Sequence, residues 1–198
     1  GWQIDVAALL DVQTARRSAS FLVRRLELMS EDSIRVLSAG AALGKEFDFM
    51  LAAELVQHGD LAASILQDAT RRHLVWVDDL TGRCSFAHDK IREALLGRLD
   101  YAERRELHSR AADAMHSMEA EGVSVFDLAY HLDAAGRHQA ALPYALRSAE
   151  TARTQHALDS ALSHYRMAER GVSPDDLDTR VVISEGLGDV LALKGAYD

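Results

Sequence analysis

The sequence predicts a mainly α-helical protein with one small β-hairpin, and three observations lead to this fold class. Apolar residues recur at spacings of three and four over most of the 198 residues. Only two prolines, Pro143 and Pro174, interrupt these patterns. In residues 74–88 the helical spacing of apolar residues gives way to an alternation of apolar and polar residues. We therefore expect short helices before this stretch and a longer series of helices after it.

Three helices are expected before the alternating stretch. Ser30 is a suitable N-cap for a first helix over residues 31–43, because two acidic residues follow in its first turn, and Gly44 suits a left-handed C-terminal cap. The apolar spacing predicts a second helix over residues 48–59 and a third over residues 60–72. Three short helices in succession are typical of a helix-turn-helix core.

The alternating stretch predicts a hairpin. Residues 75–77 and 84–86 carry β-branched and aromatic side chains, and the turn-prone stretch 78–82 separates them. A closing helix is expected from Asp89, with three apolar residues on its buried face: Ile91, Leu95 and Leu99. Three helices, a two-stranded hairpin and a closing helix predict a winged-helix domain over residues 30–100.

The sequence predicts further helices from Asp100 onward. A helix is expected from Asp100, with Glu103 completing a capping box. Its apolar stripe comprises Leu107, Ala111, Ala114, Met115 and Met118. Four alanine-rich helices should follow from Val125 onward, over residues 126–136, 137–154, 157–171 and 179–198.

The last helices carry a degenerate repeat. Small residues are required where paired helices cross, because backbones approach closely only over Ala or Gly. Ala161, Tyr165 and Ala168 occupy the small, aromatic and small positions of one helix, and Leu187 and Gly188 the Leu-Gly positions of the next. Pro174 and the stretch 195–197 fit the connecting turns. The pattern resembles tetratricopeptide repeats and predicts a superhelix of such repeats over residues 101–198.

The second helix of the last repeat would begin beyond Asp198, so we expect the sequence to be a piece of a larger protein. Residues 1–29 would then be a connecting helical region. The apolar face of the last helix should be partly uncovered at Val181, Val182, Leu187, Leu191 and Tyr197.

Composition excludes several classes of function. The single cysteine, Cys84, excludes an internal disulfide and a multi-cysteine zinc site, and is expected to be a half-buried strand residue. The net charge of −9 disfavours nucleic acid as a partner. No apolar run is long enough to cross a membrane and no leader peptide is recognisable, so we expect a soluble, cytoplasmic chain.

The chain also lacks the residues of a nucleotide hydrolase. It contains no G-x-x-x-x-G-K-[ST] loop and no apolar strand ending in paired acids for Mg²⁺. We therefore expect this segment to be no enzyme, with no catalytic residue, no metal ligand and no cofactor held by this segment alone.

One short stretch carries a family resemblance. Residues 86–95, FAHDKIREAL, resemble the Met-His-Asp…Leu-X-Arg-Glu motif that ends the winged-helix domain of STAND signalling ATPases, the class of NLR proteins and bacterial LuxR-type LAL regulators. Residues 41–47 resemble the AAVLGREF segment of that class, residues 105–108 its RRxLH helix, and residues 129–132 its entry to the repeats. The order of the four stretches also matches.

The resemblance implies a role for His88. In STAND proteins the histidine of this motif contacts the β-phosphate of ADP in the nucleotide-binding domain of the same chain, and ATP or ADP is bound with Mg²⁺ in that domain. By resemblance, His88 would make this contact in the parent protein. Asp89 is expected to serve as a helix cap, and Arg92 as an exposed ion-pair partner.

The segment would then be a regulatory arm of a signal-transduction ATPase, either a transcription regulator or a signalling kinase. The winged helix would report nucleotide state, and the repeats would bind a protein partner. The effector, such as a LuxR-type DNA-binding domain, a kinase or a cyclase, would lie elsewhere in the parent.

Two other classes remain as alternatives. In a DNA-binding winged helix with an oligomerisation tail, the third helix would lie in the major groove, yet Arg71 and Arg72 at its end are its only basic residues. In an HD-type metal phosphohydrolase the His-Asp pair would bind a metal. The other eight histidines show no second metal-ligand spacing.

Overall fold

The computed structural model describes residues 24–117 and 124–195, and these residues are mainly helical with a small three-stranded antiparallel sheet. The predicted mainly-α class is confirmed. The chain divides into two compact units, Gly1–Tyr101 (unit 1) and Ala102–Asp198 (unit 2). The connecting region predicted over residues 1–29 lies almost entirely outside the described residues.

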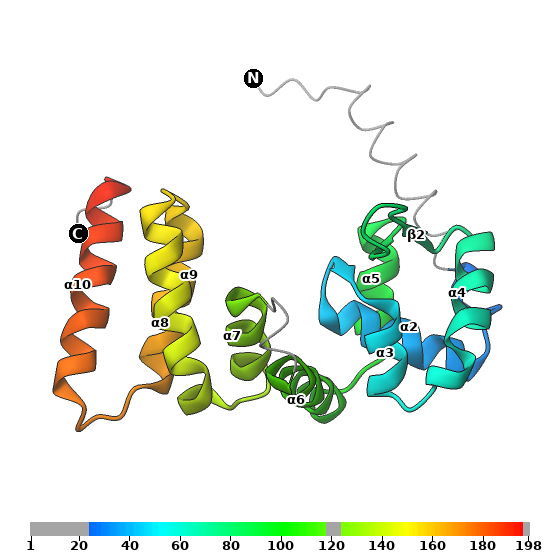
Figure 1. Ribbon diagram of the computed structural model, residues 1–198, viewed down its shortest axis with the longest axis horizontal. Coiled ribbons are helices and arrows are strands. Elements are labelled where there is room, and N and C mark those ends of the chain that lie inside the picture. The colour runs from blue at the N-terminus through cyan, green and yellow to red at the C-terminus, as the bar shows by residue number, and fades with distance from the viewer. Residues whose placement is uncertain (1–23, 118–123, 196–198) are drawn as a thin grey trace, which may run out of the picture. The chain divides into compact units, whose positions relative to one another are not determined.

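Unit 1 contains short helices around the sheet (Figure 1). Its elements in chain order are α2 (Glu31–Leu43), β1 (Glu46–Phe47), α3 (Phe49–Leu55), a 3₁₀ turn (Gly59–Leu61), α4 (Ala62–Arg71), β2 (Val75–Val77), β3 (Cys84–Phe86) and α5 (Asp89–Leu96).

Side-chain caps determine where the first helices begin. The Ser30 hydroxyl accepts a hydrogen bond from the Ser33 amide at 3.2 Å, and α2 covers the predicted residues 31–43. Asp48 caps α3 in the same way. The predicted second helix was too long, because α3 ends at Leu55 and Gln57 adopts a left-handed conformation with φ 64°.

Gly44 ends α2 in a conformation other than the predicted left-handed cap. Its φ is 155° and its ψ −165°, which lies in a region that glycine alone adopts readily. The Gly44 amide still closes the last turn by donating to the Gly40 carbonyl oxygen at 3.2 Å. The extended backbone then leads directly into β1, which explains why the left-handed prediction was wrong.

The sheet has the order β1-β3-β2. The predicted hairpin is confirmed, with Val75 opposite Phe86 and Val77 opposite Cys84. The prediction of only two strands was incomplete, because β1 pairs with the other edge of β3 and places Phe47 opposite Cys84. Two residues are too few to show an alternating pattern.

Phe47 connects the sheet to the helices of unit 1. Its ring stacks on Phe86 with centroids 5.0 Å apart and is almost fully buried. A Cβ atom at Gly40 would lie 2.8 Å from Phe47 Cδ2, so α2 needs glycine at this point to approach the ring. Ile91 and Leu95 of α5 are fully buried in the same unit, as predicted, whereas Leu99 lies beyond the helix and is half-buried.

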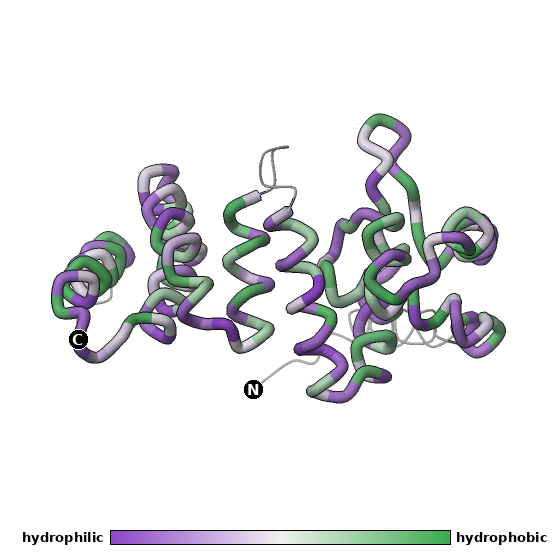
Figure 2. Tube along the Cα trace, turned by 60° about the horizontal axis from the view of Figure 1, so that its bottom comes forward, coloured by the Kyte–Doolittle hydropathy of each residue, from purple (hydrophilic) through white to green (hydrophobic). Residues whose placement is uncertain are grey.

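Unit 2 consists of helices that follow one another along the chain, with polar and apolar residues alternating along them (Figure 2). They are α6 (Tyr101–Ser117), α7 (Val125–Ala134), α8 (His138–Thr154), α9 (Leu158–Gly171) and α10 (Leu177–Leu193). The predicted helices of this part are confirmed within two residues at each end, except that α10 ends at Leu193 where the prediction ran to Asp198, and residues 196–198 lie outside the described residues. Met118, expected in the stripe of α6, lies outside the described residues.

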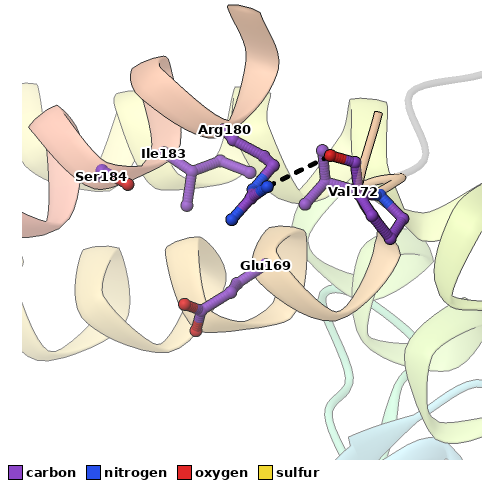
Figure 3. Close-up of a pocket in the computed structure, with 6 residues that line it drawn as sticks. Glu169, Val172, Arg180, Ile183 and Ser184 are labelled. Atoms are coloured by element: carbon purple, nitrogen blue, oxygen red, sulfur yellow. Dashed lines mark hydrogen bonds between the residues drawn. The ribbon is translucent and has the colours of Figure 1, made fainter. Parts of the chain in front are cut away.

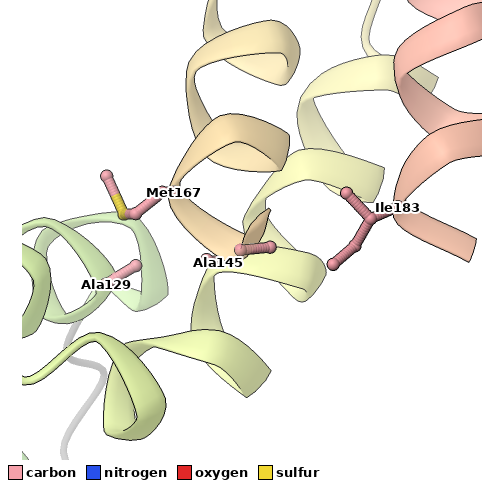
Figure 4. Packing of buried hydrophobic residues seen from close by; sticks show 5 residues of the cluster. Ala129, Ala145, Met167 and Ile183 are labelled. Atoms are coloured by element: carbon pink, nitrogen blue, oxygen red, sulfur yellow. The ribbon is translucent and has the colours of Figure 1, made fainter. Parts of the chain in front are cut away.

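Alanines allow the helices of unit 2 to approach closely. One cluster joins Ala129 of α7, Ala145 of α8, Met167 and Ala168 of α9 and Ile183 of α10 (Figure 4). The predicted small, aromatic and small residues of α9 (Ala161, Tyr165 and Ala168) are all buried. Close approach over small side chains is therefore the packing rule of this unit.

A glycine that the repeat pattern did not indicate allows α9 and α10 to cross. A Cβ at Gly186 would lie 2.5 Å from Tyr165 Cε1, whereas no described atom would come within 4 Å of a Cβ at Gly188. The small residue at the α9–α10 crossing is therefore Gly186. The helix expected to pair with Gly188 would begin beyond Asp198, so the role of Gly188 in the repeat stays a prediction.

The exposed side of α10 carries large apolar residues among charged ones. Leu177 and Val181 are 66% and 55% exposed, and Val182 is similarly exposed, as predicted for the valines. Leu187 and Leu191 are half-buried, and Tyr197 lies outside the described residues.

Candidate functional site

His88 lies at the junction between β3 and α5. The Ala87 amide donates to the Leu74 carbonyl oxygen at 2.9 Å, so the residue before His88 is held on the sheet. His88 itself is extended, with φ −157° and ψ 141°, and α5 begins at the next residue. The sheet and the helix together therefore determine where this imidazole lies.

The His88 ring serves as the N-cap of α5. Its Nδ1 accepts a hydrogen bond from the Lys90 amide at 3.0 Å, and the side chain is exposed. Because Nδ1 accepts, a neutral ring carries its hydrogen on Nε2. No hydrogen bond connects Nε2 to another described residue, so this nitrogen can donate to an external acceptor.

The structure corrects the role expected for Asp89. The N-cap is His88, and Asp89 is the first residue of α5. An acid in the first turn still complements the helix dipole, as predicted. Lys90 and Glu93 form an ion pair along the exposed side of the same helix.

The prediction that Arg92 is an exposed ion-pair partner is wrong. Its side chain is half-buried, and Nε donates to the carbonyl oxygens of Ala41 and Gly44 at 3.0 and 3.1 Å. These carbonyls lie at the C-terminal end of α2, where helices leave acceptors without internal partners. Arg92 therefore fixes α5, and with it His88, to the end of α2.

The site can donate a hydrogen bond to an anion. The Lys90 amide is used by the cap, and the Ile91 amide donates to the His88 carbonyl oxygen. The His88 Nε2–H, next to the positive end of the α5 dipole, is the donor best placed for a phosphate or carboxylate oxygen.

Cys84 is unsuited to nucleophilic chemistry. It was expected to be half-buried and is instead almost fully buried. Burial, and then the nearby charge of Asp48, raise the pKa of its thiol above the ordinary value. In residues 24–117 and 124–195, no group of three or more His, Cys, Asp or Glu side chains could hold a metal ion.

The arginines of α4 are engaged within their own helix. The Asp68 carboxylate accepts from Arg71 Nη2 at 2.6 Å and from Arg72 Nε at 2.8 Å. The hydrogen bonds from Arg72 and then Arg71 hold the pKa of Asp68 below its ordinary value. An acid shared by both arginines reduces the positive charge that a DNA-reading helix would present.

A groove of about 290 Å³ lies between α9 and α10, and sequence reasoning did not indicate it (Figure 3). Arg180 crosses it and donates from Nη1 to the Pro174 carbonyl oxygen at 3.1 Å. The groove is lined by Glu169, Val172, Pro174, Arg180, Ile183 and Ser184. The hydrogen bond from Arg180 thus holds the loop between the two helices.

In the described part of the chain, no helix combines the length and the apolar character needed to cross a membrane. Comparisons with models of protein families, with curated proteins and with solved structures found no match. Function has to be inferred from the residues and their geometry.

Proposed function

We propose that this chain is a non-catalytic regulatory segment of a STAND-like signal-transduction ATPase, acting in the cytoplasm as part of a transcription regulator or a signalling kinase. Residues 30–100 would act as a winged helix that responds to nucleotide state, and residues 101–198 as tetratricopeptide-like repeats that bind a protein partner. The observation that carries the proposal is the exposed His88 imidazole, which caps α5 through Nδ1 and keeps Nε2 available.

The arrangement of unit 1 supports the winged-helix part of the proposal. Three helices, α2 to α4, precede the hairpin β2–β3, and α5 follows it, which is the order expected of that domain. The additional strand β1 enlarges the sheet on the side of β3 away from β2. The domain would thus present its strand-to-helix junction, with His88, to the nucleotide-binding domain of the parent.

The chemistry of the contact is a single charge-assisted hydrogen bond. Nε2 of His88 would donate to a β-phosphate oxygen of ADP, and the N-terminus of α5 would add positive potential at the same place. ADP would therefore favour the closed state, and loss of the contact would free the arm. The nucleotide and its Mg²⁺ would be held by the parent protein, outside this segment.

The exposed apolar residues of α10 support a binding role for unit 2. Leu177 and Val181 are more than half exposed, and apolar surface commonly marks sites of protein association. The two units would then have different tasks, with nucleotide sensing in the first and partner binding in the second.

The experiment compares two substitutions in the full-length protein that contains this chain. His88→Asn keeps a capping acceptor on α5 but shortens the side chain and removes Nε2, whereas His88→Ala removes both. Loss of a charge-assisted bond of about 1.5–3 kcal/mol should raise the ADP dissociation constant by roughly ten- to a hundredfold in both variants. Both variants should also signal constitutively, because the ADP-bound closed state is weakened.

The proposal fails if the full-length protein has no phosphate-binding loop upstream of this chain. It also fails if His88→Asn retains ADP and the basal signal of the wild type. An ADP defect in His88→Ala that is absent in His88→Asn would show that His88 acts only by stabilising α5.

A further inference from the structure

Two histidines on neighbouring helices form a buried pair in unit 2. Nδ1 of His108 on α6 lies 2.8 Å from Nδ1 of His131 on α7, with side chains that are 6% and 1% exposed. A hydrogen bond between two ring nitrogens needs one N–H and one lone pair. The bond therefore exists only while at least one of the two Nδ1 atoms is unprotonated.

A second contact joins the same two helices. Arg105 of α6 donates from Nε and Nη2 to the carbonyl oxygen of Ala135, the C-terminal cap of α7, at 3.2 and 3.1 Å. The next residue, Gly136, has φ 75°, and a Cβ there would lie 2.7 Å from Arg105 Nη2. We call these two contacts, Arg105–Ala135 and His108–His131, the α6–α7 clasp.

An aromatic ring and two cations lie near the histidine pair. Tyr130 of α7 packs nearly perpendicular to both imidazoles, at centroid distances of 5.5 and 5.2 Å. Arg104 and Arg105 lie one turn before His108 on α6, and Tyr144 of α8 packs against the adjoining apolar cluster. Because the two arginines are permanently cationic, each further proton on the pair is opposed by their charge.

We propose that the His108–His131 pair is a proton-sensitive latch, which holds α6 on the repeat helices when neutral and releases it when both imidazoles are protonated. In the doubly protonated pair each Nδ1 carries a hydrogen, so the bond between them is lost. Two buried cations then face each other in place of a hydrogen bond. Separation of α6 from α7 relieves both costs by admitting water.

The release should be local to α6. Helices α7, α8 and α9 remain joined through the buried alanines Ala129, Ala145 and Ala168, which do not titrate. Opening of the clasp takes up protons from the solvent. The equilibrium constant for opening therefore rises about tenfold for each unit that the pH falls and for each proton bound. The inference does not depend on the proposed function, because it concerns contacts within unit 2 alone.

Hydrogen exchange on the complete 198-residue chain tests the latch, between about pH 7.5 and about pH 5.5, where imidazoles titrate. As the pH is lowered, protection factors in α6 should fall by about tenfold per pH unit for each proton bound, while those in α8 and α9 should change less. His164 on α9 is a second acid-sensitive group, since burial lowers its pKa. Its protonation would act on α9 and on α7, where Phe126 packs against its ring, so α8 is the reference helix for α6.

A double variant removes the titration and keeps the bond. In His108→Asn/His131→Asn an amide donor can face an amide acceptor, so α6 protection should lose its pH dependence. His156→Asn is the matched control, since His156 is exposed and its φ of 59° suits asparagine, and this variant should keep the wild-type behaviour.

The ring nitrogens of the wild-type chain give a readout that does not require the double variant to fold. In ¹⁵N spectra of histidine-labelled protein, His108 and His131 should reach the doubly protonated state over the same pH range in which α6 loses protection. The latch is refuted by unchanged α6 protection relative to α8, by pH dependence that persists in a folded double variant, or by ring titration at a different pH.

Discussion

The ring of Tyr165 lies against the backbone of Gly186, at the point where α9 and α10 cross. A Cβ on Gly186 would stand 2.5 Å from Cε1 and 2.6 Å from Oη of the ring. The ring is buried, and its hydroxyl donates to Glu150 Oε2 at 3.2 Å, so it has little freedom to move away. Two residues later, Gly188 faces open space.

Gly186→Ala and Gly188→Ala should therefore change stability in opposite directions. At Gly186 the added methyl group meets a fixed ring, and the cost should be about 1–3 kcal/mol or more. At Gly188 alanine removes the entropic cost of glycine in a helix and should stabilise the chain by up to about 1 kcal/mol. Urea unfolding followed by circular dichroism measures both. Destabilisation by both substitutions to the same extent would mean that the α9–α10 crossing is not as described.

Arg92 should matter for stability in a way that an exposed arginine does not. Arg92→Met keeps much of the side-chain volume but leaves the Ala41 and Gly44 carbonyls without their donor, so we expect a loss of about 1–3 kcal/mol. Arg35→Met, on the exposed side of α2, is the control and should be nearly neutral. Equal effects of the two substitutions on urea midpoints would contradict the bridging role of Arg92.

The elements that could be predicted are those whose signals are local. Ser30 and Asp48 cap helices through atoms three residues away, and the hairpin residues alternate over a short stretch. The residues that make these interactions lie within a few positions of one another in the sequence. The bounds of α2 and of the hairpin could therefore be predicted closely.

The elements that could not be predicted depend on distant partners. Arg92 reaches carbonyls 48 and 51 residues earlier, and β1 exists because β3 offers an edge to a two-residue strand. The crossing at Gly186 depends on where Tyr165 lies in three dimensions, and no sequence pattern indicated it. For the candidate site, the sequence indicated His88 by resemblance. Only the structure shows that Nδ1 caps α5 and that Nε2 has no hydrogen-bond partner among the described residues.

Asp133 should make the stability of unit 2 depend on pH in acid. Its carboxylate accepts from Arg170 at 2.6 and 3.1 Å and from His138 Nδ1 at 2.9 Å. Burial raises the pKa of this carboxyl, but the hydrogen bonds from Arg170 and His138 outweigh burial and leave it below the ordinary value. The stabilisation is therefore fully present above the unfolded pKa of about 4 and is lost as the pH falls through the lower folded pKa.

Asp133→Asn should cost about 1.5–3 kcal/mol at neutral pH, because it removes the charge from three hydrogen bonds. The difference from the wild type should shrink as the pH falls below about 4, where Asp133 of the unfolded wild-type chain begins to protonate, and vanish below the folded pKa. Asp159→Asn is the control, since that side chain is 90% exposed in its pair with Lys194 and should have no measurable effect. A wild-type-to-variant difference that stays constant from neutral pH into strong acid would exclude the charge as its source.

His88 should contribute to the stability of unit 1 only as a helix cap, and two substitutions separate that role from any ligand contact. The Lys90 amide at the start of α5 depends on Nδ1 of His88 for a partner, since amides of a first helical turn have no carbonyl within the helix to bond. His88→Ala removes that acceptor, so thermal and urea unfolding should show a loss of about 0.5–2 kcal/mol. In His88→Asn the side-chain oxygen can accept the same bond, and asparagine is a favoured N-cap, so the stability should match the wild type or exceed it slightly. If His88→Asn is instead as unstable as His88→Ala, the imidazole stabilises unit 1 through contacts other than the cap.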